Sequence, residues 1–369
     1  MPNATAPKSS GLLFDATSSL AVRPRDGGGQ PRRPHGHEWD AYVHDHPDGT
    51  IFHTQAWREA VESVFGHQPV YLSAYRGTRL IGVLPMFFVD SRFVGRVLIS
   101  VPYAVGGGIL ADDAPTTQAL FESARQAALC RACRGIDFRS ERAVIDELPV
   151  VGRHVGFKRA LPDRVEDVLV SLPRKARAAA RNARRKFGLS ISYSDQFLPQ
   201  VWKLYTRSMR RLASPNYPYA FFKQLVDATP GAHWVALVRH EGEPIAGLVT
   251  FLYRDTVLPY FVGLSDEAKH YGAANFLYLC TMERAVAKGY RYFDFGRSRK
   301  DNQGSYDFKR FQGFEPHPLG YQFYTAPGQR SPALSPTDAR WSIARRIWPR
   351  LPLCVTRPLG ARLSRHFPG

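Results

Sequence analysis

The chain has 369 residues, 44% of them hydrophobic, and a formal net charge of +18. This length predicts two domains of about 150 residues each, and the hydrophobic share is ordinary for a globular protein with a sizeable core. Four cysteines argue against a disulfide framework, and no apolar run reaches the roughly 18 residues of a membrane span, so we expect a cytoplasmic protein.

The positive charge is concentrated in two segments. Residues 173–186 and residues 340–369 each hold seven cationic side chains and no acid, which together make 14 of the net +18. A local excess of this kind favours an anionic partner or surface.

The N-terminal part alternates between helix and strand patterns. Residues 1–36 are rich in Pro, Gly, Ser and Arg without periodicity, which predicts a disordered arm. From Thr54, a helix cap, to Phe65 the hydrophobic spacing is helical. Further segments follow: strands at 70–75, 80–89 and 96–102, a helix at 116–134, and a strand or loop at 143–150.

An internal repeat indicates two similar α/β lobes. The segments Gly77–Gly82 and Gly242–Gly247 both read Gly-x-x-x-x-Gly between two hydrophobic strand patterns. Two chance glycine pairs are an alternative, but the matching flanks favour duplication. We place the junction between the lobes near residues 160–170.

A basic helix is predicted between the lobes, from Ser171, which can cap it, to Gly188, which can end it. One narrow face is apolar, and another carries arginines that repel one another at this spacing. Arg174 and Lys175 at its start are candidate ligand contacts. A phosphate-rich partner is favoured over a merely solvated charged helix, because no counter-charge is in reach in the sequence.

The central motif is a strand–turn–helix–strand unit over residues 257–295. A β-rich run is followed by a turn, and from Asn275 hydrophobic residues recur at helical spacing up to Gly289. Small residues in the turn and the free N–H groups of the helix start suit a pyrophosphate, although plain helix initiation gives the same pattern. The candidate binding residues are Lys269, Gly272, Ala273, Ala274 and Asn275.

The exit of the second strand is the richest candidate site. Residues 294–316 alternate polar and cationic groups with aromatic ones just after a strand end, where open α/β sheets bind ligands. Lys309 could polarise an acyl carbonyl or neutralise an oxyanion, and Tyr306 could pass a proton to a leaving group. Arg297 and Ser298 are candidate binding residues, and Asp294 is expected to accept hydrogen bonds from Arg297 and backbone donors. The alternative is that the segment only closes the sheet.

No metal or dinucleotide site is expected. Cys130 and Cys133 form a C-x-x-C pair without a second pair, and the histidines of the first 53 residues lack a metal-binding frame. The glycines at 106–108 lack the spacing of a dinucleotide-binding loop.

The basic tail interleaves large apolar residues with arginines between Trp341 and Arg350. That pattern suits contact with an anionic membrane face; a tail packed on its own domain is the alternative.

Several of these stretches carry a family resemblance. The sequence resembles the FemAB-related branch of the GNAT-like acyltransferases, and within it the FemAB-type proteins associated with the XrtA exosortase/PEP-CTERM and exopolysaccharide system. The matching stretches are Ser171–Arg177, Val257–Phe261, Tyr292–Ser298, Tyr306–Lys309, Gly313–Pro316 and Arg350–Leu353.

The resemblance implies an α/β (α+β) fold of two tandem GNAT-like lobes, each a mixed sheet flanked by helices. Together with the repeat, it places the lobes at 37–165 and 166–328 and the basic tail at 329–369. It also implies transfer of an acyl or aminoacyl group, by a BioF2-like acetyltransferase domain, to an amine or hydroxyl of a cell-envelope or exopolysaccharide precursor.

For the donor, the resemblance implies acyl-CoA as co-substrate, with no tightly bound cofactor and no DNA partner. The family lysine before Gly-Phe matches Lys309. Lys269 departs from the Arg or Gln that begins the family's pyrophosphate turn. The coiled-coil arm of the tRNA-dependent members is absent, which disfavours aminoacyl-tRNA. A tRNA-dependent peptidyltransferase and a non-catalytic membrane-surface scaffold of polysaccharide assembly stay open as alternatives.

Overall fold

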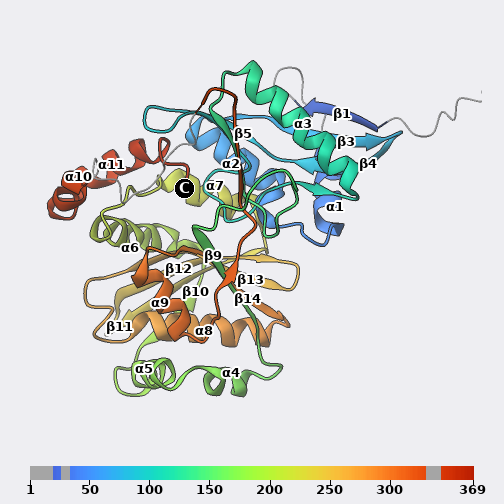
Figure 1. The fold of residues 1–369 in the computed structure, drawn as a ribbon. Coiled ribbons are helices and arrows are strands. Elements are labelled where there is room, and N and C mark those ends of the chain that lie inside the picture. The colour runs from blue at the N-terminus through green and yellow to red at the C-terminus, as the bar shows by residue number, and fades with distance from the viewer. Residues whose placement is uncertain (1–19, 26–33, 330–341) are drawn as a thin grey trace, which may run out of the picture.

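A computed structural model describes residues 20–25, 34–329 and 342–369 (Figure 1). The N-terminal lobe contains two sheets. The first has the strand order β1-β3-β4-β7 and the second β16-β8-β6-β5-β2. Their strands are β1 (Leu20–Arg25), β2 (Gln68–Pro69), β3 (Tyr71–Arg76), β4 (Arg79–Leu84), β5 (Phe87–Ser91), β6 (Gly95–Ile99), β7 (Leu110–Ala111), β8 (Gly135–Phe138) and β16 (Gln322–Thr325), with helices α1 (Pro34–Asp45), α2 (Gln55–Phe65) and α3 (Ala114–Cys130).

The C-terminal lobe is built on one larger sheet. Its order is β10-β11-β12-β13-β14-β9-β15. The strands are β9 (His154–Ala160), β10 (Ser190–Tyr193), β11 (His233–His240), β12 (Glu243–Tyr253), β13 (Thr256–Leu264), β14 (Tyr292–Arg299) and β15 (His317–Pro318). The helices are α4 (Val165–Ser171), α5 (Arg174–Arg185), α6 (Leu198–Arg211), α7 (Tyr219–Ala228), α8 (Ala273–Ala287) and α9 (Gln303–Phe311), followed by α10 (Ser342–Ile347) and α11 (Leu353–Ser364).

The two lobes exchange strands. β9 precedes the C-terminal lobe in the chain but pairs antiparallel with β14 in its sheet, and β16 crosses back to pair antiparallel with β8. Each lobe is therefore completed by the other. The expected domain limits at 165 and 328 stay a prediction.

The predicted repeat is present as two β-hairpins with the same irregularity. In β3–β4 the pairing shifts between Ala74 and Tyr75, and in β11–β12 it shifts between Val238 and Arg239. The registers align Gly82 with Ala246, which pairs with Val238, so the two glycine pairs are offset by one residue. The duplication lies in the bulged hairpin and not in the glycine positions themselves.

Both lobes also contain two parallel strands joined through a helix. β6 and β8 flank α3 and pair at Leu98↔Ile136 and Ile99↔Asp137. β13 and β14 flank α8 and pair at Thr256↔Tyr292 and Val257↔Phe293. Parallel neighbours need such a crossover connection, and the predicted unit over 257–295 is confirmed as β13–α8–β14.

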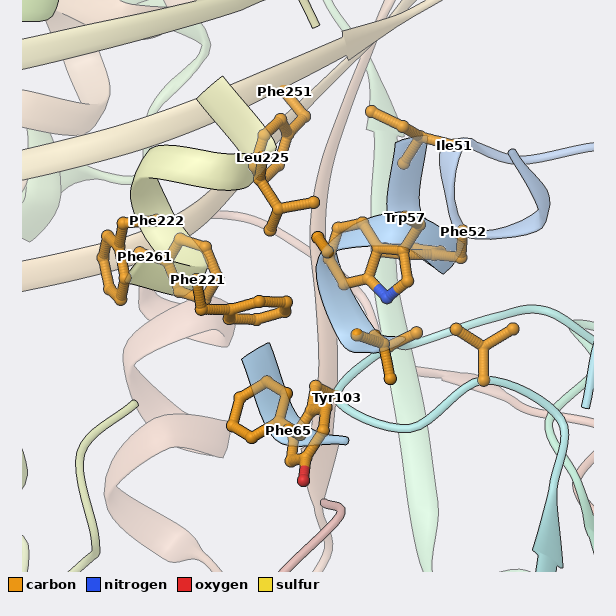
Figure 2. Close-up of a cluster of buried hydrophobic side chains, with 14 of the residues drawn as sticks. Ile51, Phe52, Trp57, Phe65, Tyr103, Phe221, Phe222, Leu225, Phe251 and Phe261 are labelled. Atoms are coloured by element: carbon orange, nitrogen blue, oxygen red, sulfur yellow. The ribbon is translucent and has the colours of Figure 1, made fainter. Parts of the chain in front are cut away.

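One aromatic core runs across both lobes. Figure 2 shows Trp57 of the N-terminal lobe between Phe52 of the same lobe and Phe221 and Phe251 of the C-terminal lobe. The Trp57 side chain is fully buried, and its ring lies 5.9 Å from both Phe221 and Phe251. Truncating such a core aromatic residue costs about 3–5 kcal/mol. Because this packing is shared, it fixes the two lobes relative to each other.

The basic helix differs from its prediction. The chain turns at Leu172, and α5 begins at Arg174 with Pro173 at its N-cap. The residue before a proline avoids the helical region, so Ser171 ends α4 and its hydroxyl donates to the Val168 carbonyl at 2.7 Å.

The termini are only partly described. Most of the expected disordered arm lies outside the described residues, but within it Leu20–Arg25 forms β1, paired with β3, and α1 begins at Pro34. Trp341 of the tail also lies outside them. No helix in the described ranges is long and apolar enough to cross a membrane.

Candidate active site

The end of β14 carries a bulge that shapes the candidate site. The pairing of β14 with β9 shifts between Asp294 and Arg297, and Gly296 has a φ of +65° within that interval. Asp294 Oδ1 accepts a hydrogen bond from the Gly296 N–H at 2.7 Å, so the carboxylate holds the bulge closed. Burial raises the pKa of Asp294.

The expected Asp294–Arg297 contact is not formed. Arg297 Nη1 instead donates to the Tyr321 hydroxyl at 3.3 Å. The guanidinium also lies over the Tyr321 ring, 5.6 Å from its centroid. The bulge turns the Arg297 side chain away from Asp294, whereas the predicted backbone donor to Asp294 is present.

Lys309 lies directly behind the bulge. It is on α9, whose first turn is capped by Asn302, which accepts from the Ser305 N–H. Its side chain is 8% exposed, and Nζ donates to the carbonyls of Arg297 at 2.8 Å and Gly296 at 3.3 Å. Burial lowers the pKa of Lys309 to about 7, although the charge of Asp294 opposes the shift. The ammonium is thus held inside the protein, at a pKa near neutrality.

Tyr306, on α9, and Ser298, on β14, both lie close to Lys309. The Tyr306 ring packs edge-on against Phe157, 5.5 Å between centroids, and Lys309 Nζ lies 5.2 Å from the same Phe157 ring. Ser298 is buried and its hydroxyl is 2.9 Å from that of Ser305. The structure therefore gathers Arg297, Ser298, Tyr306 and Lys309 around the end of β14.

The predicted pyrophosphate turn is a separate feature at the start of α8. Gly272 has a φ of +65° and occupies the N-cap position without a side-chain cap. Lys269 is exposed, Ala274 and Asn275 are partly exposed, and Ala273 is buried. The carbonyl of Ala179 on α5 is 3.1 Å from the point where a Cβ on Gly272 would lie. Backbone of α5 therefore borders the turn on one side, and only glycine fits there.

α8 connects the turn with the bulge. Tyr278, one turn into the helix, packs against Phe295 of β14 at 4.7 Å and against Phe308 of α9 at 5.6 Å. β13 and β14 stay paired only at their first residues. Beyond them, the Tyr260 hydroxyl of β13 donates to the Tyr103 carbonyl at 2.6 Å, so the N-terminal lobe borders the opening between these strands.

Arg174 and Lys175 are exposed at the start of α5. The preceding Pro173 ring is 3.0 Å from the point where a Cβ on Gly313 would lie, which places this helix start beside the end of α9. The expectation that α5 has no counter-charge is wrong for one residue, because Arg184 forms an ion pair with Glu283 of α8.

A cleft lies between the lobes at the bulge. Asp294 and Gly296 are among its lining residues from the C-terminal lobe, opposite residues 106–108 and 139–142 of the N-terminal lobe. The sequence analysis did not identify the cleft residues of the N-terminal lobe, although the sequence contains a pattern that indicates them. The motif Asp137-Phe-Arg-Ser140, which begins in β8 and runs past its end, repeats, without the glycine, the motif Asp294-Phe-Gly-Arg-Ser298 of β14.

The structure shows no metal cluster in the ranges it describes. Cys133 is buried and Cys130 is exposed at the end of α3, both as free thiols, and burial raises the pKa of Cys133 to about 11.

Comparison with known proteins gives one matching domain family and several similar structures. Residues 172–310 match the family described as acetyltransferase (GNAT) domain. The structure is similar to FemX, with a TM-score of 0.62 at 15% identity, over 79% of this chain and 96% of that one. It is also similar to a tandem GNAT protein from the clavulanic acid biosynthesis pathway, with a TM-score of 0.53 at 13% identity, over 84% and 98% of the two chains.

A third similar structure is L-PGS from Bacillus licheniformis, with a TM-score of 0.52 at 14% identity, over 88% of this chain and 98% of that one. No curated protein sequence matches the chain. The protein therefore has the tandem GNAT-like fold, as the sequence predicts. The match to the acetyltransferase (GNAT) domain family is confined to residues 172–310.

Proposed function

We propose that the protein is an acyltransferase that uses acyl-CoA and transfers the acyl group to an amine or hydroxyl of a cell-envelope or exopolysaccharide precursor. The observation that carries the proposal is the pairing, within one lobe, of an uncapped helix start at Gly272 with the buried Lys309 of α9, which contacts the end of the neighbouring strand β14. The link to the exosortase system rests on the sequence resemblance alone.

In this proposal the donor pyrophosphate binds at the start of α8. The free N–H groups there and the positive end of the helix dipole favour an anion, and Lys269 adds a positive side chain. Lys269 is exposed, which leaves it free to reach a diphosphate. Arg174 and Lys175 extend the same basic surface along α5.

The reaction forms a C–N or C–O bond and breaks the thioester C–S bond. The acceptor attacks the carbonyl carbon, and the CoA thiolate leaves and takes a proton, for which Tyr306 is the proposed donor. The acceptor releases its own proton to solvent, and a proton from solvent restores the Tyr306 hydroxyl. Lys309 supplies positive charge beside the bulge, where the oxyanion develops. Arg297 and Ser298 position the acceptor. Holding donor and acceptor in one orientation is the other contribution of the site.

The test is a set of melting and transfer experiments on the full chain with acetyl-CoA, longer acyl-CoAs and charged tRNA. A donor that binds only the folded state raises the melting temperature, and the rise grows with the logarithm of its concentration above the dissociation constant. We expect a shift with an acyl-CoA but none with charged tRNA. The absence of a shift with every acyl-CoA, or full turnover by Lys309→Ala, would contradict the proposal.

An aminoacyl-tRNA donor is the second candidate, and the exposed cations of α5 favour it. Arg181, Arg185 and Lys186 are exposed beside Arg174 and Lys175. Binding of tRNA through them would weaken steeply with salt, because each phosphate contact releases a counterion. A steep salt slope together with aminoacyl transfer would favour this donor over acyl-CoA.

We also propose that the tail touches an anionic membrane face from the cytoplasmic side. Ile343 and Ile347 are 69% and 49% exposed on α10, and Arg346 and Arg350 are exposed at the same helical spacing. Exposed apolar residues beside arginines suit an interfacial helix. Cosedimentation with phosphatidylglycerol vesicles, compared with phosphatidylcholine vesicles, tests it; Ile343→Glu with Ile347→Glu should abolish binding. A scaffold without catalysis would keep this binding but show no donor shift.

A further inference from the structure

Two arginines, one from each lobe, converge on one point. Arg139 follows β8 and Arg297 lies near the end of β14, in the two copies of the repeated motif. The position of a Cβ on Gly369 lies 3.2 Å from Arg297 Nη2 and 3.8 Å from Arg139 Nη1. Because the strands are equivalent in the two lobes, the duplication brings the two guanidinium groups together across the interface.

The positive charge of the two arginines is only partly balanced by acidic side chains. Arg139 is 2% exposed, and its Nη2 forms an ion pair with Asp137 at 2.9 Å. Arg297 has no Asp or Glu side chain within ion-pair distance among the residues that the structure describes, and its Nη1 contact is the neutral Tyr321 hydroxyl. Buried charges are normally paired. The pKa of His154 is lowered to about 3, first by burial and then by Arg297 and Arg139, which indicates a positive local field.

Main-chain oxygens of the tail lie where the two arginine side chains meet. Arg139 Nη1 donates to the Pro368 carbonyl at 3.2 Å, and Nη2 donates to the Gly369 oxygen at 2.6 Å. The Pro368 carbonyl also accepts from the Tyr103 N–H at 2.9 Å. Phe367 stacks on Phe93 at 5.0 Å. These contacts hold residues 367–369 along the N-terminal lobe.

The point is connected with the cleft between the lobes. Arg139 itself lines the cleft, as do Gly296, next to Arg297, and Val105. The Val105 carbonyl accepts from the Tyr321 hydroxyl that contacts Arg297. The carbonyl of Arg297 in turn accepts from Lys309. A ligand in the cleft therefore contacts Arg139, and Arg297 follows the lining residue Gly296 at the strand end that carries the proposed chemistry.

We propose that Arg139 and Arg297 form an anion-binding site between the lobes, which takes a carboxylate or phosphate group of the acyl acceptor, and that residues 367–369 occupy it when no ligand is bound. The acceptor part of this inference rests on the proposed function. Guanidinium groups bind carboxylate and phosphate through paired, charge-assisted hydrogen bonds. An anion in the cleft therefore competes with the tail oxygens for the same N–H donors.

The test uses the full chain, with inorganic phosphate and acetate as separate probes against chloride at matched ionic strength. We expect at least one of them to raise the melting temperature and to bind measurably by calorimetry, and the better probe identifies the group. Arg297→Gln should weaken its binding at least tenfold, and Arg297→Lys should restore part of it. Arg291→Gln is the matched control, because Arg291 is exposed just before the same strand. No binding, or equal binding by Arg297→Gln, would overturn the site.

Hydrogen exchange at the Tyr103 amide tests the tail. That amide donates to Pro368, so displacement of the tail by the preferred probe should speed its exchange in the wild-type chain. Unchanged protection at a saturating probe concentration would overturn the occupancy by residues 367–369. Acyl-CoA melting shifts of the same variants keep the proposals separate: anion binding without any donor shift contradicts the acyl-CoA function and leaves the anion site standing.

Discussion

The two lobes share a strand–helix–strand unit but treat the start of its helix differently. In the N-terminal lobe, Asp113 caps α3, and its carboxylate accepts from the Thr116 N–H at 2.8 Å and pairs with Arg76 at 2.8 Å. In the C-terminal lobe, α8 starts at Gly272 without a side-chain cap. A carboxylate at a helix start satisfies the free N–H groups and the dipole.

The two lobes therefore differ in whether the start of this helix can bind an external anion. The α3 start already has its own anion, whereas the α8 start leaves N–H groups for an external one. The lysine behind the bulge also belongs to the C-terminal lobe. We therefore expect the C-terminal lobe to bind the donor and the N-terminal lobe to contribute one wall of the acceptor cleft.

The largest expected effect is that of Lys309→Ala. Removing the ammonium should lower the rate of acyl transfer about 100-fold or more, as loss of one oxyanion-stabilising group does. Steady-state kinetics on a folded variant measures it, and Arg310→Ala, at the exposed neighbour, should leave the rate within about twofold under the same assay. A rate near that of the wild type for Lys309→Ala would mean that the lysine stabilises the bulge and takes no part in catalysis.

Ala274→Glu would make the start of α8 resemble that of α3. The new carboxylate lies in the first turn, where it favours the helix but competes with a donor pyrophosphate. We expect acyl-CoA binding to weaken about tenfold by calorimetry, which corresponds to about 1.4 kcal/mol, while the melting temperature does not fall. Ala274→Gln, of the same size and without charge, is the control. Equal losses for both variants would point to steric and not electrostatic competition.

Gly296→Ala tests the glycine that distinguishes the two copies of the repeated motif. Its φ of +65° is strained for alanine, and the new Cβ would lie 3.2 Å from Val105. We expect the free energy of unfolding to fall by about 1–2 kcal/mol. Gly304→Ala in α9 is the control, since nothing lies within 4 Å of its Cβ position, and it should be neutral or stabilising. Denaturant unfolding of both variants decides between strain and a general intolerance of this segment.

The lowered pKa of Lys309 also predicts that the free energy of unfolding depends on pH. Its pKa falls from 10.5 to about 7 on burial, so between these values the unfolded chain binds a proton that the folded chain does not. Stability from this group therefore rises with pH across that window. Activity that needs the ammonium should decline as pH rises through about 7, where Lys309 of the folded chain loses its proton. Melting curves of Lys309→Met should lack this rise; an unchanged profile would show that another group is responsible.

The smallest effect concerns the N-terminal lobe. Asp113→Ala should lower the melting temperature by a few degrees at most through loss of the cap, without altering donor binding. Its pKa is lowered to about 2 by hydrogen bonds from Thr116 and Arg76. The stabilisation is thus present above the ordinary carboxyl pKa and is lost as pH falls towards 2. Asp113→Asn should retain most of the cap. A change in acyl-CoA affinity would contradict the division between the lobes.

The local sequence pattern was sufficient to predict the helices and strands of this region and much of the candidate site. The periodicity of residues 257–295 predicts β13, α8 and β14, because burial of one helix face and of a strand depends on residue spacing. The grouping of Tyr306 and Lys309 at one strand end follows from their spacing of three on a helix. The boundary at Pro173 was also available locally, since a proline constrains the residue before it.

Contacts between distant parts of the chain were decided only by the tertiary structure. The exchange of β9 and β16 depends on which lobe offers an open sheet edge, and strand pairing leaves no local mark. The Arg139–Arg297 pair joins residues 158 positions apart in the chain, and only the packing of the lobes brings them together. The pKa of Lys309 likewise depends on desolvation by Phe157 and the bulge, which no spacing in the sequence encodes.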